Sequence, residues 1–121
     1  MTEKATLSGR MAQYIDTATF EKIEPAVVQK AKEVILYHLA LAIRCRRDEL
    51  SAGAQAVKVA RRLSPQGGSA TLIGYRDRAL PIDAAFANAT QMRAHGLDDV
   101  VFPAGIHAGL VTIPIALALA E

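Results

Sequence analysis

The sequence predicts an all-α fold of about five helices, with one short extended segment near residues 70–75. Hydrophobic residues make up 51% of the 121 residues, and 23 residues are Ala, which has the highest helix propensity. Aromatic residues make up only 5%, and Trp is absent. Such a core of small aliphatic side chains suggests helices that approach one another closely. In several segments the apolar residues also recur every three or four positions, which is the period of an amphipathic helix.

The first two helices are predicted over residues 4–18 and 25–45. The first has an apolar face made by five residues, namely Leu7, Met11, Tyr14, Ile15 and Ala18. The second begins at Pro25, because proline is preorganised for the first helical position and lacks only an amide that would have no partner there. Its C-terminal half, VILYHLALAI, is apolar nearly all round and predicts a central helix.

The third helix is predicted over residues 48–63, with Ala and Val on one side and basic residues on the other. The segment SPQGGS that follows has the composition of a turn. After the extended residues 70–75, Pro81 opens a fourth helix over residues 81–95. A loop over residues 96–106 leads to the last helix, which runs from about His107 to the end of the sequence.

Charge and cysteine content argue against several classes of protein. The formal net charge is +2, and the basic residues fall in small groups interrupted by acidic or apolar residues. Because a basic face with stacking aromatics is missing, we expect no nucleic-acid partner and interpret these groups as solvated helix ends. The single cysteine, Cys45, excludes an intrachain disulfide. The N-terminus has no apolar signal segment, so the expected location is the cytoplasm.

The mean hydropathy of +0.18 is high for so short a chain. Small domains have much surface to cover with polar residues, so the chain is expected to belong to something larger, to pair with another chain or to touch lipid. Residues 100–120 contain no charged side chain and are long enough to span a membrane. However, they include two prolines and two glycines. A buried helix is therefore favoured over a transmembrane one, and no membrane partner is expected.

The richest polar cluster comprises Arg93, His95, Asp98, Asp99 and His107 around a loop between two apolar helices. Histidine moves protons near neutral pH, and an adjacent carboxylate orients it or raises its basicity. The helix that follows His107 offers free amides at its N-terminus, where a substrate carboxylate binds well. The spacing matches no specific metal site, so no metal is expected. From residue types alone, ordinary helix caps explain the two aspartates as well as catalysis does.

Two other features have simpler interpretations. His38 lies on the apolar stripe of the second predicted helix, where a core histidine bonded to a neighbour is favoured over a catalytic one. Gly67-Gly68-Ser69 lacks the Gly-Lys-Ser/Thr ending of a phosphate-binding loop and is interpreted as a plain turn.

Three segments carry four motifs that resemble, in the same order along the chain, the N-terminal part of the MmgE/PrpD family. EPAVVQKAKEVILYHLALAI is similar to the family helix P-x-x-V-x-x-x-A-K-x-x-x-L-D-x-L-G. GGSATLIGYRDRALPIDAAFANAT resembles its G-x-A-T-x-x-G turn and A-A-x-x-N-G helix start. LDDVVFPAGIHAGLVTIPIALALAE is similar to its D-F-D-D … H-P-S-x-x-x-x-P-A-x-x-A-L-A-E stretch. This family includes 2-methylcitrate dehydratase, cis-aconitate decarboxylase and iminodisuccinate epimerase.

The resemblance implies that residues 1–121 are an incomplete portion of a large all-helical domain. Family enzymes add or remove a proton next to a carboxylate in small di- or tricarboxylates, and they require no cofactor. The expected function is therefore part of a lyase or isomerase, similar to 2-methylcitrate dehydratase. A homo-oligomer such as a dimer, or a missing C-terminal portion, is the expected partner. The alternative is a non-catalytic truncated protein that pairs with a partner chain through its C-terminal helix.

The resemblance also implies roles for individual residues. His107 matches the active-site histidine, although Ala108-Gly109 replace the family's Pro-Ser, and Asp98 and Asp99 match its two adjacent aspartates. An earlier family aspartate falls on Gly96. His107, Asp98 and Asp99 are thus the expected catalytic residues. Arg93, which takes the place of a family histidine, and the nearby His95 are expected to bind substrate.

Overall fold

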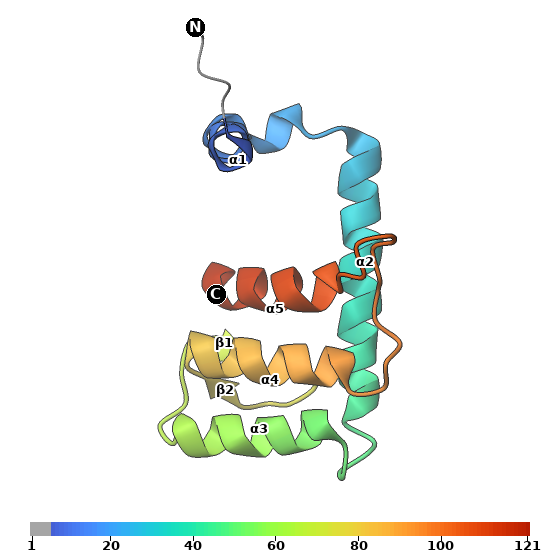
Figure 1. The fold of residues 1–121 in the computed structure, drawn as a ribbon. Coiled ribbons are helices and arrows are strands. Elements are labelled where there is room, and N and C mark those ends of the chain that lie inside the picture. Colours follow the sequence, from blue (N-terminus) through green and yellow to red (C-terminus); the bar gives the residue numbers. More distant parts are fainter. Residues whose placement is uncertain (1–5) are drawn as a thin grey trace, which may run out of the picture. The chain divides into compact units, whose positions relative to one another are not determined.

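The computed structural model describes residues 6–121. The chain divides into two compact units, Met1–Lys32 and Glu33–Glu121. The boundary falls within helix α2 (Pro25–Cys45), which contributes its first turns to one unit and the rest to the other. Figure 1 shows the elements of both units, and each unit is described by itself below.

The first unit contains helix α1 (Leu7–Thr17), the single 3₁₀ turn η1 (Phe20–Lys22) and the start of α2. Thr6 caps α1, because its Oγ1 accepts a hydrogen bond from the Gly9 amide at 3.1 Å. The helix predicted over residues 4–18 is thus confirmed for Leu7–Thr17, whereas residues 4 and 5 lie outside the described part of the chain. The apolar side chains of α1 are exposed.

The second unit continues with helix α3 (Ala52–Leu63), strands β1 (Ala70–Thr71) and β2 (Arg78–Ala79), and helices α4 (Pro81–Arg93) and α5 (Ala108–Ala120). Helix α4 lies between α3 and α5 and packs against both (Figure 1). The two strands pair antiparallel, with Ala70 opposite Ala79, and contact α4. The fold is therefore all-α, as the sequence predicts, with one minimal sheet.

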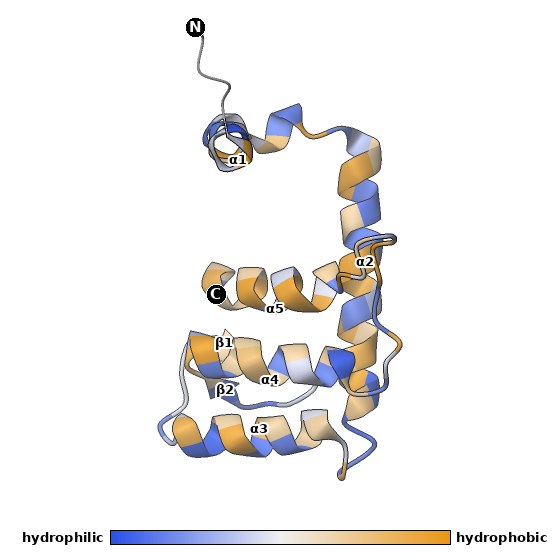
Figure 2. Cartoon of the chain, in the orientation of Figure 1, coloured by the Kyte–Doolittle hydropathy of each residue, from blue (hydrophilic) through white to orange (hydrophobic). Residues whose placement is uncertain are grey.

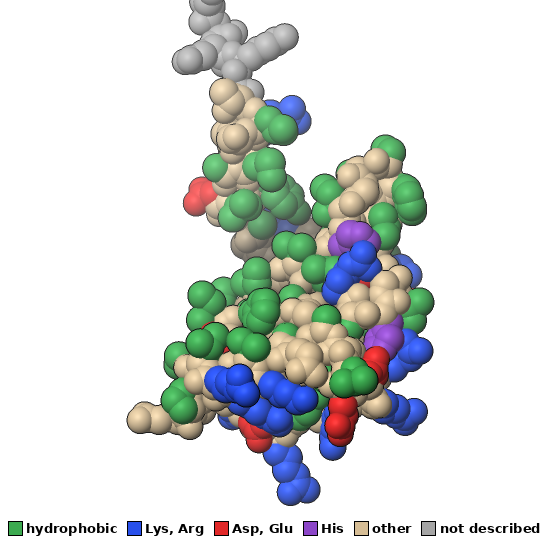
Figure 3. All heavy atoms as spheres, turned by 60° about the horizontal axis from the view of Figure 1, so that its bottom comes forward, with side chains coloured by type: hydrophobic (Ala, Val, Ile, Leu, Met, Phe, Trp, Pro, Cys, Tyr) green, Lys and Arg blue, Asp and Glu red, His purple; other side chains and the backbone are tan. Residues whose placement is uncertain are grey.

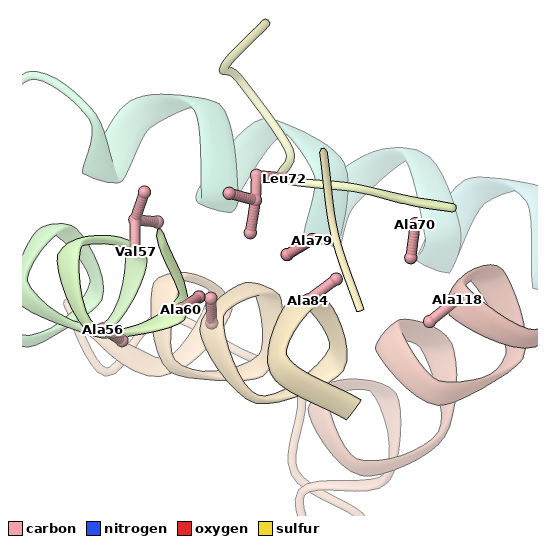
Figure 4. Packing of buried hydrophobic residues seen from close by; sticks show 9 residues of the cluster. Ala56, Val57, Ala60, Ala70, Leu72, Ala79, Ala84 and Ala118 are labelled. Carbon is pink, nitrogen blue, oxygen red and sulfur yellow. The ribbon is translucent and has the colours of Figure 1, made fainter. Parts of the chain in front are cut away.

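Alanine builds much of the core of the second unit, as the low aromatic content predicts. Figure 4 shows side chains of one buried cluster, most of them small, which come from α3, α4, α5 and the strands and include Leu72. The buried alanines of this cluster are Ala56, Ala60, Ala70, Ala79, Ala84, Ala87 and Ala118. A second cluster joins α2 to α4 and α5 through Ala42, Met92 and Ile113. Through this second cluster α2 supports the ends of the two helices that flank the candidate site.

Three element boundaries differ from the predicted ones, each for a local reason. Helix α3 begins at Ala52 rather than residue 48, because the Ser51 hydroxyl accepts from the Ala54 amide at 3.2 Å and so caps the helix. The extended segment is limited to Ala70–Thr71, since a turn follows in which the Tyr75 amide donates to the Leu72 carbonyl. Helix α4 ends at Arg93 rather than residue 95, where Gly96 with φ +62° closes a turn onto the Arg93 carbonyl.

Glu121 ties the end of α5 to the two strands. Its Oε2 accepts from the Thr71 amide at 3.0 Å and from the Thr71 hydroxyl at 2.6 Å, and it pairs with Arg78. The Thr71 hydroxyl is the main reason that the pKa of Glu121 lies below its ordinary value, and Arg78 lowers it further, while burial opposes both. This carboxylate fixes the packing of α5 against β1.

The basic groups take part in structural contacts on the face that carries α3. Figure 3 shows Lys and Arg side chains gathered where that face comes forward. The guanidinium groups of Arg46 and Arg61 lie 5.6 and 4.8 Å from the centre of the Tyr75 ring. Arg61 also pairs with Asp77, and Arg46 donates to the Gly74 carbonyl. These partners account for two of the arginines that we interpreted as solvated helix ends.

The last helix is mostly apolar and contains no charged residue (Figure 2). Among residues 6–121, no helix combines the length and the apolar character that crossing a membrane requires.

Candidate functional site

The polar cluster lies on the loop between α4 and α5. Within this loop, the Val101 amide donates to the Ile106 carbonyl at 2.8 Å, and the Gly105 amide donates to the Val101 carbonyl at 2.9 Å. Gly105 has φ +65°, a conformation that glycine adopts without strain. The chain therefore folds back on itself, and this turn brings Asp98 and Asp99 beside His107.

Asp98 is the buried centre of a row of three charged or titratable side chains. Its carboxylate is fully buried, and Oδ1 accepts from Arg93 Nη1 at 2.9 Å. Its Oδ2 lies 2.7 Å from His107 Nδ1, which is an ion-pair distance, although the two groups are not aligned for a hydrogen bond. Burying a carboxylate is costly unless it is paired, and Arg93 supplies the opposite charge. Helix α4 thus positions the aspartate that faces His107.

His107 occupies the N-cap position of α5, and its side chain is 32% exposed. Its Nδ1 also lies 3.1 Å from the Asp99 carbonyl oxygen. Because a carbonyl can only accept, Nδ1 must carry the hydrogen of the neutral imidazole. Among the described residues, Nε2 has no hydrogen-bonding partner. The lone pair of Nε2 is therefore available to take a proton from a bound molecule.

Asp99 serves a different purpose from Asp98. Its carboxylate oxygens accept from the Gly109 amide at 3.0 and 3.1 Å, which satisfies an amide in the first turn of α5. Asp99 is therefore a helix cap, one of the two interpretations that the sequence left open. As a result, the Gly109 amide is not free to bind a substrate carboxylate.

The carboxylate of Asp99 also contacts His38 of α2. The distance from His38 Nε2 to Asp99 Oδ1 is 2.9 Å, although the ring is not aligned for a good hydrogen bond. The His38 side chain is fully buried, and its Nδ1 lies 2.8 Å from the Val34 carbonyl oxygen. Nearby, the Tyr37 hydroxyl donates to the Leu97 carbonyl. Two consecutive residues of α2 thus hold the loop.

Gly109 permits this arrangement because it has no side chain. A Cβ at this position would lie 2.3 Å from His38 Cε1, 2.4 Å from His38 Nε2 and 2.7 Å from Asp99 Oδ1. Real Cβ atoms do not approach other atoms so closely. Helix α5, His38 and Asp99 therefore meet at a point where only glycine fits.

Four of the five predicted site residues come together, namely Arg93, Asp98, Asp99 and His107. His95 does not join the contacts among them, because its Nε2 lies 3.9 Å from Asp48 in the link between α2 and α3. Sequence reasoning placed His38 in the core bonded to a neighbour, which is confirmed, but did not connect it with the site. A histidine on an apolar stripe does signal a buried partner, but the identity of that partner depends on the tertiary fold.

No group of three or more metal-ligating side chains that could hold an ion is found within residues 6–121. Comparison with known families gives one finding, a match of residues 9–121 to the MmgE/PrpD N-terminal domain. No curated protein and no solved structure matches the chain.

Proposed function

Since the chain belongs to the MmgE/PrpD family, we propose that it forms the N-terminal portion of an enzyme that moves a proton next to a carboxylate group. The substrate class is a small di- or tricarboxylate, and the reaction class is a lyase or isomerase similar to 2-methylcitrate dehydratase. The observation that carries the proposal is the row Arg93–Asp98–His107, in which a buried, charge-paired aspartate faces a partly exposed histidine.

In the proposed mechanism, His107 is the acid–base residue. Its Nε2 takes the proton from the carbon beside the substrate carboxylate, or returns a proton to it. Asp98 stabilises the imidazolium that forms, because its Oδ2 lies 2.7 Å from Nδ1. The hydrogen already on Nδ1 leaves Nε2 as the only ring nitrogen that can accept a proton. Asp99 contributes by fixing Nδ1 through its backbone carbonyl.

Arg93 is proposed to bind the substrate carboxylate. It uses one nitrogen for Asp98, its side chain is 51% exposed, and a guanidinium group has five N–H donors. If Arg93 binds both Asp98 and the substrate carboxylate, the carbon beside that carboxylate is held close to His107, the proposed base. His95, which was expected to share this role, is proposed to assist only from the edge of the site, because its contact is with Asp48.

We expect His107→Gln to lower turnover by about 100-fold or more, because general acid–base catalysis contributes about that factor. The variant keeps a polar side chain of similar length but has no titratable nitrogen. The assay uses the protein at its natural full length with tricarboxylates such as 2-methylcitrate, and with iminodisuccinate. Lys58→Ala, on the exposed side of α3, is the control and should retain activity. Unchanged turnover in His107→Gln would rule out this role.

One observation favours the second candidate function, a non-catalytic protein that pairs through α5. Val111, Ile115 and Leu119 recur every four residues along this helix and are 54%, 51% and 77% exposed. Such a stripe is typical of a helix that packs against a partner, here proposed to be a second copy of the chain or a further portion of the protein. In analytical ultracentrifugation of the 121-residue chain we expect a dimer or larger species. A folded monomer at high concentration would contradict pairing between copies.

A further inference from the structure

The hydrogen-bond acceptors around the His38 ring determine where its hydrogens lie. Val34 presents a backbone carbonyl to His38 Nδ1 at 2.8 Å, and a carbonyl only accepts. The hydrogen of a neutral His38 therefore lies on Nδ1. Its Nε2 would then carry no hydrogen, although it lies only 2.9 Å from Asp99 Oδ1. Two acceptors at this distance in a buried place repel each other.

One additional proton removes this conflict. With a hydrogen on Nε2, the contact becomes an ion pair between an imidazolium and a carboxylate. The close packing at Gly109 shows that the space between α5, His38 and Asp99 is already filled. Asp99 in turn is suited to carry the negative charge, because its oxygens also accept from the Gly109 amide at the positive end of α5.

The surrounding groups are consistent with this assignment. On its own helix, His38 meets the edge of the Tyr37 ring, with the ring centres 5.8 Å apart. The loop contributes Asp98 and His107 near Asp99, and α4 contributes Arg93, which is paired with Asp98. Helix α5 contributes the Gly109 amide, which donates to Asp99. Asp99 is therefore the carboxylate that contacts His38 directly, whereas Asp98 is paired with Arg93.

We propose that His38 is a positioning residue that holds Asp99 through an ion pair and thereby fixes His107. The connection runs through one residue, since Asp99 faces His38 with its carboxylate and His107 with its carbonyl oxygen. His38 is fully buried and has no access to substrate. The consequence for catalysis rests on the proposed function, whereas the ion pair and its effect on the loop do not.

Nitrogen NMR of the histidine rings tests the proton directly in the unmodified protein. We expect both ring nitrogens of His38 to carry a hydrogen at neutral pH, and the hydrogen on Nε2 to exchange slowly with solvent. A bare Nε2 at neutral pH would overturn the proposal. This measurement requires neither a variant nor activity, so its outcome is separate from that of the His107 experiment.

Two variants test the positioning role. His38→Leu removes the N–H group that faces Asp99, and we expect the Gly109 amide to exchange with deuterium about tenfold faster, because the contact that holds the Asp99 carboxylate is lost. His38→Gln retains a donor and should restore most of the protection. In the active full-length protein, His38→Leu should lower kcat about tenfold with little change in KM, and His38→Gln should recover it. Equal behaviour of the two variants would show that His38 only fills space.

Discussion

Gly109→Ala is expected to destabilise the protein by about 3 kcal/mol, the upper end of the range for overpacking a buried position. The added methyl group would lie 2.3 Å from the His38 ring and 2.7 Å from the Asp99 carboxylate. Neither neighbour moves easily, because His38 is fully buried and held by the Val34 carbonyl, while Asp99 caps α5. The loop would have to leave α2 or α5 to make room. Urea unfolding at neutral pH measures the loss.

Gly9→Ala is the matched control, because it makes the same change in the first turn of another helix. There the nearest atom to the new Cβ is the Thr6 hydroxyl oxygen at 3.2 Å, on an exposed side chain. Alanine is favoured over glycine within a helix by about 0.5–1 kcal/mol, so this variant should be neutral or slightly stabilised. If Gly109→Ala is as stable as Gly9→Ala, the described packing of His38 against α5 is wrong.

The sequence predicts those features of the fold that depend on neighbouring residues, and it predicts poorly those that depend on tertiary packing. Helical periodicity, Pro25 and Pro81 locate the helices, because these signals act within one or two turns. The start of α3 was predicted too early, since Asp48 and Ser51 can both cap a helix and only the observed hydrogen bonds decide between them. The short sheet was overestimated because the pairing of Ala70 with Ala79 depends on tertiary packing.

The candidate site shows the same limit. The grouping of Asp98 and Asp99 with His107 follows from residue types around one loop and could be anticipated. The different roles of the two aspartates could not, because they depend on which side chain faces Arg93 and which faces the start of α5. His38 is sixty-one residues away from Asp99 in sequence, and no local pattern joins them. Gly109 likewise has no signal of its own, since its need for a small side chain arises from His38.

Gly53→Ala should lower the free energy of unfolding by about 2–3 kcal/mol for a related reason. An added Cβ at Gly53 would lie 2.6 Å from the Gln91 Cα and 2.5 Å from the Cys45 Sγ. The first of these atoms belongs to the backbone of α4, so relief requires the two helices to separate. The alanine core would then lose contacts, because Ala56 and Ala60 on α3 reach Ala84 and Ala87 on α4 with short side chains.

A second variant separates the two obstacles at Gly53, the Cys45 sulfur and the backbone of α4, and so tests the distance between α3 and α4. Cys45 also contacts the Ser51 hydroxyl at 3.1 Å, so a variant that only shortens this side chain, Cys45→Ala, removes one of the close neighbours of the added methyl group. If the Cys45 sulfur were the whole obstacle, Cys45→Ala combined with Gly53→Ala would be no less stable than Cys45→Ala alone. We expect the double variant to remain at least 1 kcal/mol less stable than Cys45→Ala, because the Gln91 backbone is still in place. Thermal and urea unfolding of the four proteins give this comparison. Full recovery in the double variant would mean that α3 and α4 are not held at the described distance by their backbones.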